Sequence, residues 1–131
     1  MSAYKTISCS FKDQNTLVKS LESLGYNPVV YKEKRNLTGY QNDVRDQKAE
    51  IIIPRAQISS ASNDLGFSYN EESKEYEMIC SDYDIHLGLA DKVKQSYAVV
   101  AIKLALKKNK FAINEEITKD KKVSIKAGKV I

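Results

Sequence analysis

The chain has 131 residues, of which 42% are hydrophobic and 29% charged, a composition typical of folded domains that excludes wholesale disorder. This length suits one domain, so we expect residues 1–131 to form a single domain with one core. The net charge of +4 is uneven: 10 Lys and Arg face 13 Asp and Glu in residues 1–90, whereas 11 Lys face 4 Asp and Glu in residues 91–131.

The N-terminus has no apolar run behind a basic start, and no stretch is long enough to cross a bilayer. The sequence therefore predicts neither a signal peptide nor a membrane span. Cys9 and Cys80 each lie in an apolar, strand-like stretch, which favours two buried thiols in a reducing compartment over a disulfide framework. We expect the cytosol or an organelle interior.

The first half of the chain alternates strands with one helix. Apolar and polar side chains alternate in residues 4–11, as they do in a strand. Asp13 is then a suitable N-cap for a helix that ends at Gly25. Strands are predicted at residues 29–31 and 49–54, the second around three consecutive isoleucines typical of a strand buried on both faces. The polar segment Lys32–Lys48 between them is either a hairpin with a long tip or a mobile loop.

The second half begins with two runs, residues 65–69 and 76–80, in which apolar side chains occupy every second position. The short polar connection between these runs predicts a hairpin. The longest helix is expected from Leu89 to Lys110. Residues 111–117 and 123–125 then alternate as two further strands.

The expected element order predicts an α+β fold in which a mostly antiparallel sheet carries two helices on one face. This order resembles a ferredoxin-like βαββαβ core with an added hairpin.

Residues that carry chemistry are sparse. The single histidine, His86, alternates with Asp82 and Asp84, so the three could share a strand face and hold a cation or act as an enzyme site. The alternative is that the two aspartates end the hairpin and cap the next helix. The sequence contains no zinc-binding cluster of Cys and His, no glycine-rich phosphate loop and no nucleophile elbow. We therefore predict no catalytic residue, metal or cofactor.

Interaction residues are the remaining candidates. The segment Lys32–Lys48 contains Tyr40 and Arg45, residue types that carry binding energy at protein interfaces, so this segment or the open sheet face would bind a protein partner. The alternative is nucleic-acid binding by the basic C-terminal third, through Lys103, Lys107, Lys108 and Lys110. Lysines near a helix C-terminus also complement the helix dipole without any ligand.

Several short motifs carry a resemblance to a known family. They are the start Met1-Ser2 with Tyr4 and Thr6, the motifs Leu24-Gly25-Tyr26, Gly39-Tyr40 and Ala49-Glu50-Ile51-Ile52-Ile53, and further on Leu65-Gly66-Phe67, Tyr76-Glu77-Met78-Ile79 and Gln95-Ser96-Tyr97-Ala98-Val99. Across about residues 2–125 the chain resembles the hypothetical chloroplast open reading frame thirty-five family of algal plastids, cyanobacteria and other bacteria. Ala3 and Asn42 depart from that family's pattern, which has a histidine and a glycine there.

The resemblance implies a plastid stroma or bacterial cytoplasm as the location and brings no catalytic residue with it. From residues and resemblance together we expect a non-enzymatic accessory module that binds a protein partner.

Overall fold

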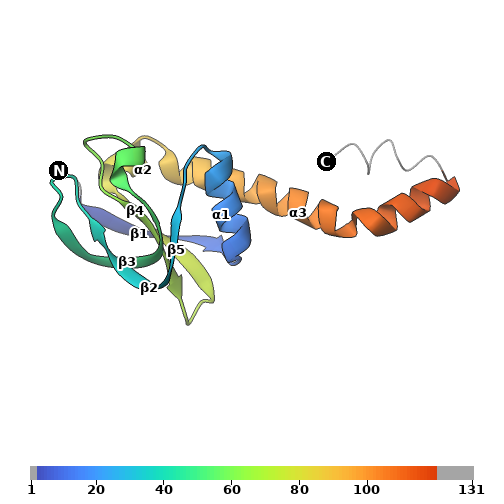
Figure 1. Cartoon of the computed structure of the whole chain (residues 1–131), viewed down its shortest axis with the longest axis horizontal. Coiled ribbons are helices and arrows are strands. Elements are labelled where there is room, and N and C mark those ends of the chain that lie inside the picture. The colour runs from blue at the N-terminus through green and yellow to red at the C-terminus, as the bar shows by residue number, and fades with distance from the viewer. Residues whose placement is uncertain (1–2, 121–131) are drawn as a thin grey trace. The chain divides into compact units, whose positions relative to one another are not determined.

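The computed structural model describes the backbone of residues 3–120 and the side chains of residues 3–109. The described part contains a five-stranded antiparallel sheet and helices that pack on it (Figure 1). The strands are β1 (Tyr4–Phe11), β2 (Val29–Thr38), β3 (Val44–Ile53), β4 (Leu65–Asn70) and β5 (Glu75–Ser81). The helices are α1 (Gln14–Ser23), the 3₁₀ turn η1 (Arg55–Gln57), the short α2 (Asp82–His86) and α3 (Leu89–Asp120).

The strands follow one another across the sheet from β2 to β5, and β1 completes it beside β5, giving the order β1-β5-β4-β3-β2. All four neighbouring pairs are antiparallel. The connection through α1 therefore carries the chain from one edge strand to the other. The predicted α+β class with an antiparallel sheet is confirmed, whereas the ferredoxin-like core stays a prediction.

Helix α1 begins where the sequence places its cap. The Asp13 carboxylate accepts hydrogen bonds from the backbone N–H of Thr16 at 2.8 Å and from its hydroxyl at 2.7 Å, and these bonds hold the pKa of Asp13 below its usual value. Gly25 follows the helix with φ of +96°, a conformation that glycine adopts without strain.

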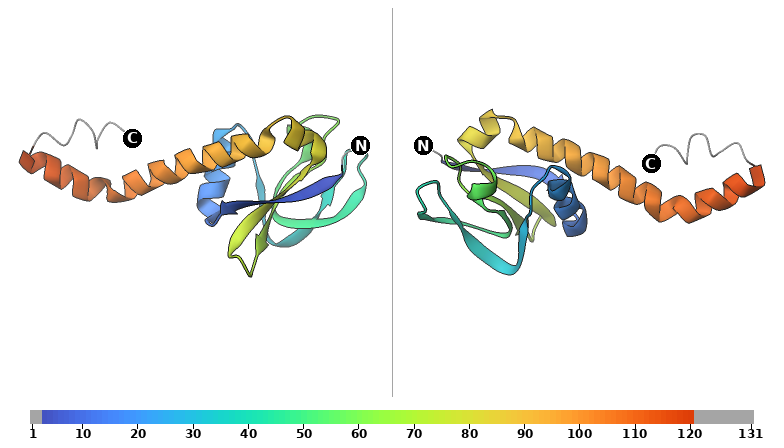
Figure 2. Two further views of the ribbon diagram at one scale, coloured as in Figure 1. Left: turned by 180° about the vertical axis from the view of Figure 1, so that it is seen from behind. Right: turned by 45° about the horizontal axis from the view of Figure 1, so that its top comes forward.

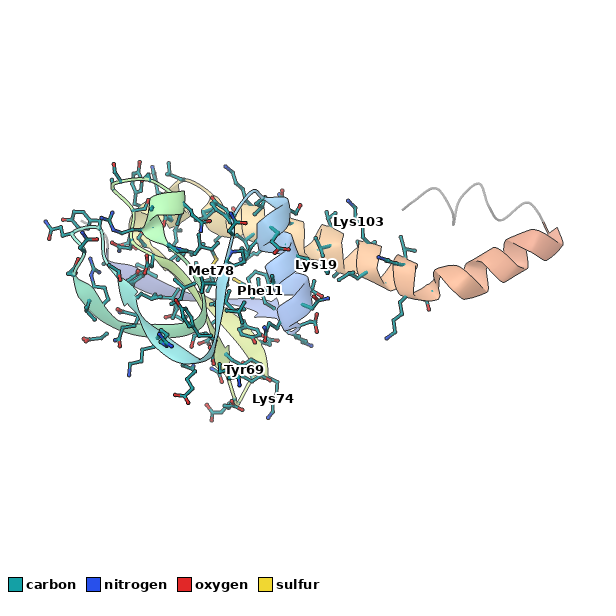
Figure 3. The ribbon with its side chains drawn as sticks, in the orientation of Figure 1. Phe11, Lys19, Tyr69, Lys74, Met78 and Lys103 are labelled. Carbon is teal, nitrogen blue, oxygen red and sulfur yellow. The ribbon has the colours of Figure 1, made fainter. Side chains whose placement is uncertain are left out.

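The main core joins one face of the sheet to α1 and the first turns of α3. Figure 2 shows the ribbons of these elements in two further views. Leu17 and Leu21 come from α1, and Val93 comes from the first turns of α3. Tyr97 fixes this part of α3, since its hydroxyl accepts the backbone N–H groups of Lys12 and Asp13 at 3.1 Å each. The sheet contributes further residues to this cluster, among them Phe11, Ile51, Ile53, Phe67 and Met78, two of which Figure 3 labels.

The opposite sheet face has a second, smaller core of Leu37, Ala49, Ile52 and Ile79. Ile52 points here while its neighbours Ile51 and Ile53 point to the main core, so the isoleucine run is buried on both faces as predicted. Leu37 lies over Gly66, where an added Cβ would approach a methyl carbon of Leu37 within 2.9 Å. No helix is therefore needed to bury this cluster.

The segment Lys32–Lys48 is a hairpin, the first of the two predicted alternatives. Its strands are longer than expected, since β2 runs to Thr38 and β3 starts at Val44, which leaves only residues 39–43 as the tip.

The strand predicted at residues 111–117 is wrong, because α3 continues as a helix to Asp120. The apolar residues Phe111, Ile113 and Ile117 resemble a strand pattern, but residues 111–120 contain no glycine or proline, and extending an existing helix costs far less than starting a new element. The strand predicted at residues 123–125 lies outside the described residues.

The contacts divide the chain into two compact units, Met1–Tyr97 and Ala98–Ile131. The first contains the sheet, α1, α2 and the start of α3; the second begins within α3. The expectation of a single domain stays a prediction. Within residues 3–120, no helix combines the length and the apolar composition needed to cross a membrane.

Candidate interaction site

The tip of the β2–β3 hairpin, residues 39–43, is closed by backbone hydrogen bonds. Gly39 donates to the carbonyl of Asp43 at 2.7 Å, and Asn42 donates to the carbonyl of Gly39 at 2.9 Å. Asn42 has φ of +64°, a left-handed conformation that asparagine tolerates better than most residues. This is the pattern of a three-residue hairpin loop, and it fixes the direction of the side chains on the tip.

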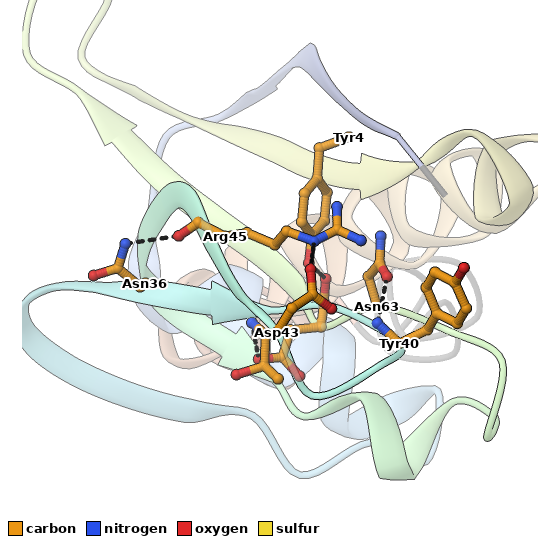
Figure 4. A network of polar contacts seen from close by, with 8 residues as sticks. Tyr4, Asn36, Tyr40, Asp43, Arg45 and Asn63 are labelled. Atoms are coloured by element: carbon orange, nitrogen blue, oxygen red, sulfur yellow. Dashed lines mark hydrogen bonds and ion pairs between the residues drawn. The ribbon is translucent and has the colours of Figure 1, made fainter. Parts of the chain in front are cut away.

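Arg45 lies across the base of this tip (Figure 4). Its guanidinium pairs with the Asp43 carboxylate, which holds the pKa of Asp43 below its usual value, and lies 5.5 Å from the centre of the Tyr4 ring. A side chain at Gly39 would collide with Arg45 and Asp43. Arg45 is therefore partly engaged in holding the tip against β1, in addition to its predicted role at the surface.

Buried polar residues from the connection between η1 and β4 hold the tip from beneath. The Asn63 side-chain oxygen accepts the backbone N–H of Tyr40 at 2.8 Å. The Asp64 carboxylate accepts the backbone N–H of Thr38 at 2.8 Å and that of Arg55 at 2.7 Å, and its backbone carbonyl accepts the Tyr4 hydroxyl at 2.6 Å. Burial and the nearby Asp64 charge raise the pKa of Tyr4, so its hydroxyl remains a donor.

Tyr40 lies within the tip, and Val44, the first residue of β3, directly follows it. Val44 is 77% exposed, which is unusual for an aliphatic residue at the start of a strand, and Tyr40 is half-buried. An apolar side chain on a hairpin tip whose backbone is fixed by buried polar groups is a suitable contact for a protein, because little conformational entropy is lost on binding.

A groove of about 560 Å³ lies beside the tip. Arg55 spans it, donating to the Asn42 side-chain oxygen and to the Ser60 carbonyl at 3.1 Å each. Both acceptors are neutral, and within residues 3–109 no carboxylate lies within ion-pair distance of Arg55. The groove thus offers a cation and backbone groups to a polar or acidic partner segment. Its other lining residues include Thr38, Pro54, Ala56 and Asp64.

A second groove, of about 360 Å³, lies among Tyr69, Tyr76, Lys32 and Glu50. The two tyrosine rings pack edge to face at 5.1 Å, and Glu50 accepts the backbone N–H of Tyr69 at 2.9 Å. Burial, followed by the Glu50 charge, raises the pKa of Tyr76. These groups largely satisfy one another, so this groove is the weaker candidate for a binding surface.

The three residues Asp82, Asp84 and His86 form part of helix α2, not a strand face. Asp82 is exposed and lies 3.7 Å from the Lys5 ammonium, His86 is exposed, and Asp84 is buried with one carboxylate oxygen that lacks a partner within residues 3–109. Helix α2 is capped by Ser81, whose hydroxyl accepts the Asp84 N–H at 3.1 Å. The predicted shared face is therefore wrong, and no group of three metal-ligating side chains occurs in the part of the chain that the structure describes.

Burial dominates the chemistry around Asp84. It raises the pKa of Asp84, and it raises the pKa of the Cys80 thiol to about 12, with the Asp84 charge as the second cause. Cys80 is buried as predicted, whereas Cys9 is half-buried, and neither forms a disulfide. A thiol with so high a pKa is a poor nucleophile at neutral pH.

The lysines predicted for nucleic-acid binding belong to the second unit. Lys103, Lys107 and Lys108 are exposed, and Figure 3 labels Lys103 on the helix; the side chain of Lys110 lies outside the described residues. These lysines and the hairpin tip belong to different units, so they are two separate candidate surfaces.

A family model matches residues 20–125, which include the hairpin tip, the buried Asn63 and Asp64, and all of α3. The chain belongs to the family described as protein of unknown function DUF1257. No curated protein and no solved structure matches it.

The family match covers both candidate surfaces but assigns no role to either. Of the residues predicted for binding, the structure brings Tyr40 and Arg45 together at one tip. Sequence reasoning missed Val44, which lies within the segment Lys32–Lys48 and outside any predicted strand. It also missed Asn63 and Asp64, which belong to a polar stretch expected to be only a connection between strands. The signal that could have found them is a run of short polar residues directly before a buried strand, since such residues can accept backbone N–H groups.

Proposed function

We propose that the chain is a non-enzymatic accessory module that binds a protein partner through the tip of the β2–β3 hairpin and the adjoining groove. The observation that carries the proposal is Val44, an aliphatic residue 77% exposed directly beside a tip that Asn63 and Asp64 hold from beneath. Such residues at interfaces supply apolar contact area at the centre, and Arg55 and Tyr40 would supply the polar contacts around it.

Affinity purification of the tagged chain at native expression tests this proposal. We expect a stoichiometric partner with the wild-type chain, and loss of that partner when Val44→Asp or Tyr40→Ala is introduced. Glu72→Ala is the matched control, because Glu72 is exposed at the tip of the β4–β5 hairpin and should leave the partner bound. If the chain is recovered alone, or if the tip variants retain the partner, the proposal is wrong.

Nucleic-acid binding is the second candidate, favoured by the exposed Lys103, Lys107 and Lys108 on α3. It predicts that affinity for a labelled single-stranded RNA falls steeply as salt rises, because bound lysines release counterions. Arginine, which suits phosphate and bases better, is absent from residues 91–131, and this ranks the candidate second.

The short motifs support placing the chain in the hypothetical chloroplast open reading frame thirty-five group, and with it in a plastid stroma or a bacterial cytoplasm. Two free thiols agree with a reducing compartment. Fractionation of the source cells followed by immunoblotting tests this location, and recovery in an oxidising compartment would contradict it.

A further inference from the structure

Helix α3 carries two apolar stripes on different sides. The first, Val93, Tyr97, Val100 and Leu104, begins in the main core. The second consists of Val99, Ile102 and Leu106 and is called here the α3 seam. At about 100° per residue the two stripes are separated by roughly 160° around the helix axis.

The α3 seam is not covered within the described residues. Ile102 is 58% exposed and Val99 48% exposed, and Leu106 is half-buried. The spacing of three and then four residues is that of a narrow helix–helix contact, in which each apolar side chain enters a gap between side chains of a second helix. A seam this narrow, on a helix with another apolar stripe behind it, differs from the broad apolar face that lies flat on a lipid surface.

The charges beside the seam decide what would cover it. Residues 98–110 contain four lysines and no Asp or Glu, and exposed Lys103 lies directly beside Ile102. A second copy of the chain would bring another segment of charge +4 against this one without a carboxylate to pair with it. A partner helix with Glu or Asp at its flanking positions would instead form ion pairs across the contact. RNA would pair with the lysines but leave the exposed isoleucine and valine without apolar contacts.

We propose that the α3 seam, with Lys103 at its border, docks an acidic amphipathic helix of a partner protein. This inference deepens the proposed function, since it rests on the chain being a protein-binding module and names the chemistry of one partner segment. It uses a surface that is separate from the hairpin tip.

Fluorescence anisotropy with the full chain tests the docking. The probe is a labelled helical peptide of about four heptads with Leu and Ile at the seam positions and Glu at the flanking positions. A second peptide has Lys in place of each Glu, and a labelled single-stranded RNA serves as the third probe. We expect the chain to bind the acidic peptide at least about tenfold more tightly than the basic one.

Variants of the chain separate the apolar and electrostatic parts. Ile102→Ala keeps a good helix former and should weaken binding of the acidic peptide. Lys103→Glu should shift the preference toward the basic peptide. The matched control, Lys19→Glu, changes the net charge equally at an exposed position outside α3 and should leave the preference intact. Circular dichroism verifies that each variant retains its helix content.

Three results would overturn the docking proposal. They are equal affinity for both peptides, tight RNA binding without acidic-peptide binding, and a dimer in sedimentation experiments that Ile102→Ala dissociates. The same assays with Val44→Asp keep the two proposals apart, because this hairpin variant should bind the acidic peptide like the wild-type chain. If the peptide assay fails, only the docking proposal is overturned, and the purification experiment still decides partner binding at the hairpin tip. If the purification fails, the peptide assay still decides docking on the α3 seam.

Discussion

The side-chain oxygen of buried Asn63 accepts the backbone N–H of Tyr40 at 2.8 Å, across 23 residues of sequence. Together with Asp64, this contact converts an exposed hairpin tip into a fixed surface. Val44, which directly follows the tip, is the most exposed large hydrophobic side chain among the described residues. The shape of the candidate site therefore depends on residues that are distant from the tip in sequence.

Replacing Asn63 by Ala should destabilise the protein by about 1–3 kcal/mol, because the buried acceptor of the Tyr40 N–H is lost. Urea unfolding followed by circular dichroism measures the change. Ser73→Ala, on the exposed tip of the other hairpin, is the control and should change stability by less than about 0.5 kcal/mol. An Asn63→Ala variant as stable as this control would show that the contact does not hold the tip.

Asp64→Asn tests the second buried support with almost no change of shape. The two carboxylate oxygens accept N–H groups from Thr38 and Arg55, and an amide offers only one acceptor in their place. One N–H would face the amide NH₂, so we expect a loss of about 2 kcal/mol in unfolding free energy and weaker partner binding. Partner binding that survives this variant unchanged would contradict the proposed role of the support.

Gly66→Ala should destabilise the second core by about 1–3 kcal/mol through overpacking. The added Cβ would lie within 2.9 Å of both Leu37 and Ala49, whose positions are set by neighbouring strands. Leu37→Val removes one of the colliding groups, so the double variant should be more stable than the sum of the two single changes predicts. Strict additivity of the three unfolding free energies would disprove this steric account.

The buried carboxyl of Asp84 should make stability depend on pH. Burial raises its pKa in the folded state above the usual value of 3.8, so its protonated form is favoured by folding. Its contribution is complete below that usual value and is lost as pH rises through the folded-state pKa. Asp84→Asn removes the charge but keeps the backbone N–H that Ser81 accepts, and it should therefore stabilise the protein at neutral pH.

The measurement for Asp84 is the difference in unfolding free energy between variant and wild type from about pH 3 to pH 7. The difference cancels carboxylates such as Asp13, whose pKa is lowered and which act in the opposite direction. We expect the difference to grow in favour of Asp84→Asn as pH rises. A difference that stays constant over this range would contradict the buried-charge account.

Local patterns predicted most of the fold because they act over few residues. The Asp13 cap, the isoleucine run and the hairpin of residues 65–80 each follow from spacing that one element imposes on its own sequence. The error at residues 111–117 arose because a few apolar residues at alternate positions suggested a strand, although α3 continues through them. So short a pattern does not distinguish a strand from a helix.

The candidate site was only partly predictable because its supports are distant in sequence. Tyr40 and Arg45 were identified by residue type, but the contacts of Tyr40 with Asn63 and of Thr38 with Asp64 depend on how β4 enters the sheet. The alternation of Asp82, Asp84 and His86 was misleading for a similar reason. Ser81 caps a short helix there, which places Asp84 inside and the other two outside.

The most direct test of the central claim is site-specific photocrosslinking in the native cell, with a photoreactive phenylalanine analogue in place of Val44. The same analogue in place of Ser73 samples the other exposed hairpin tip and is the control. We predict one dominant crosslinked protein from position 44 and none from position 73. Absence of any product from position 44, or the same products from both positions, would contradict a partner bound at the β2–β3 tip.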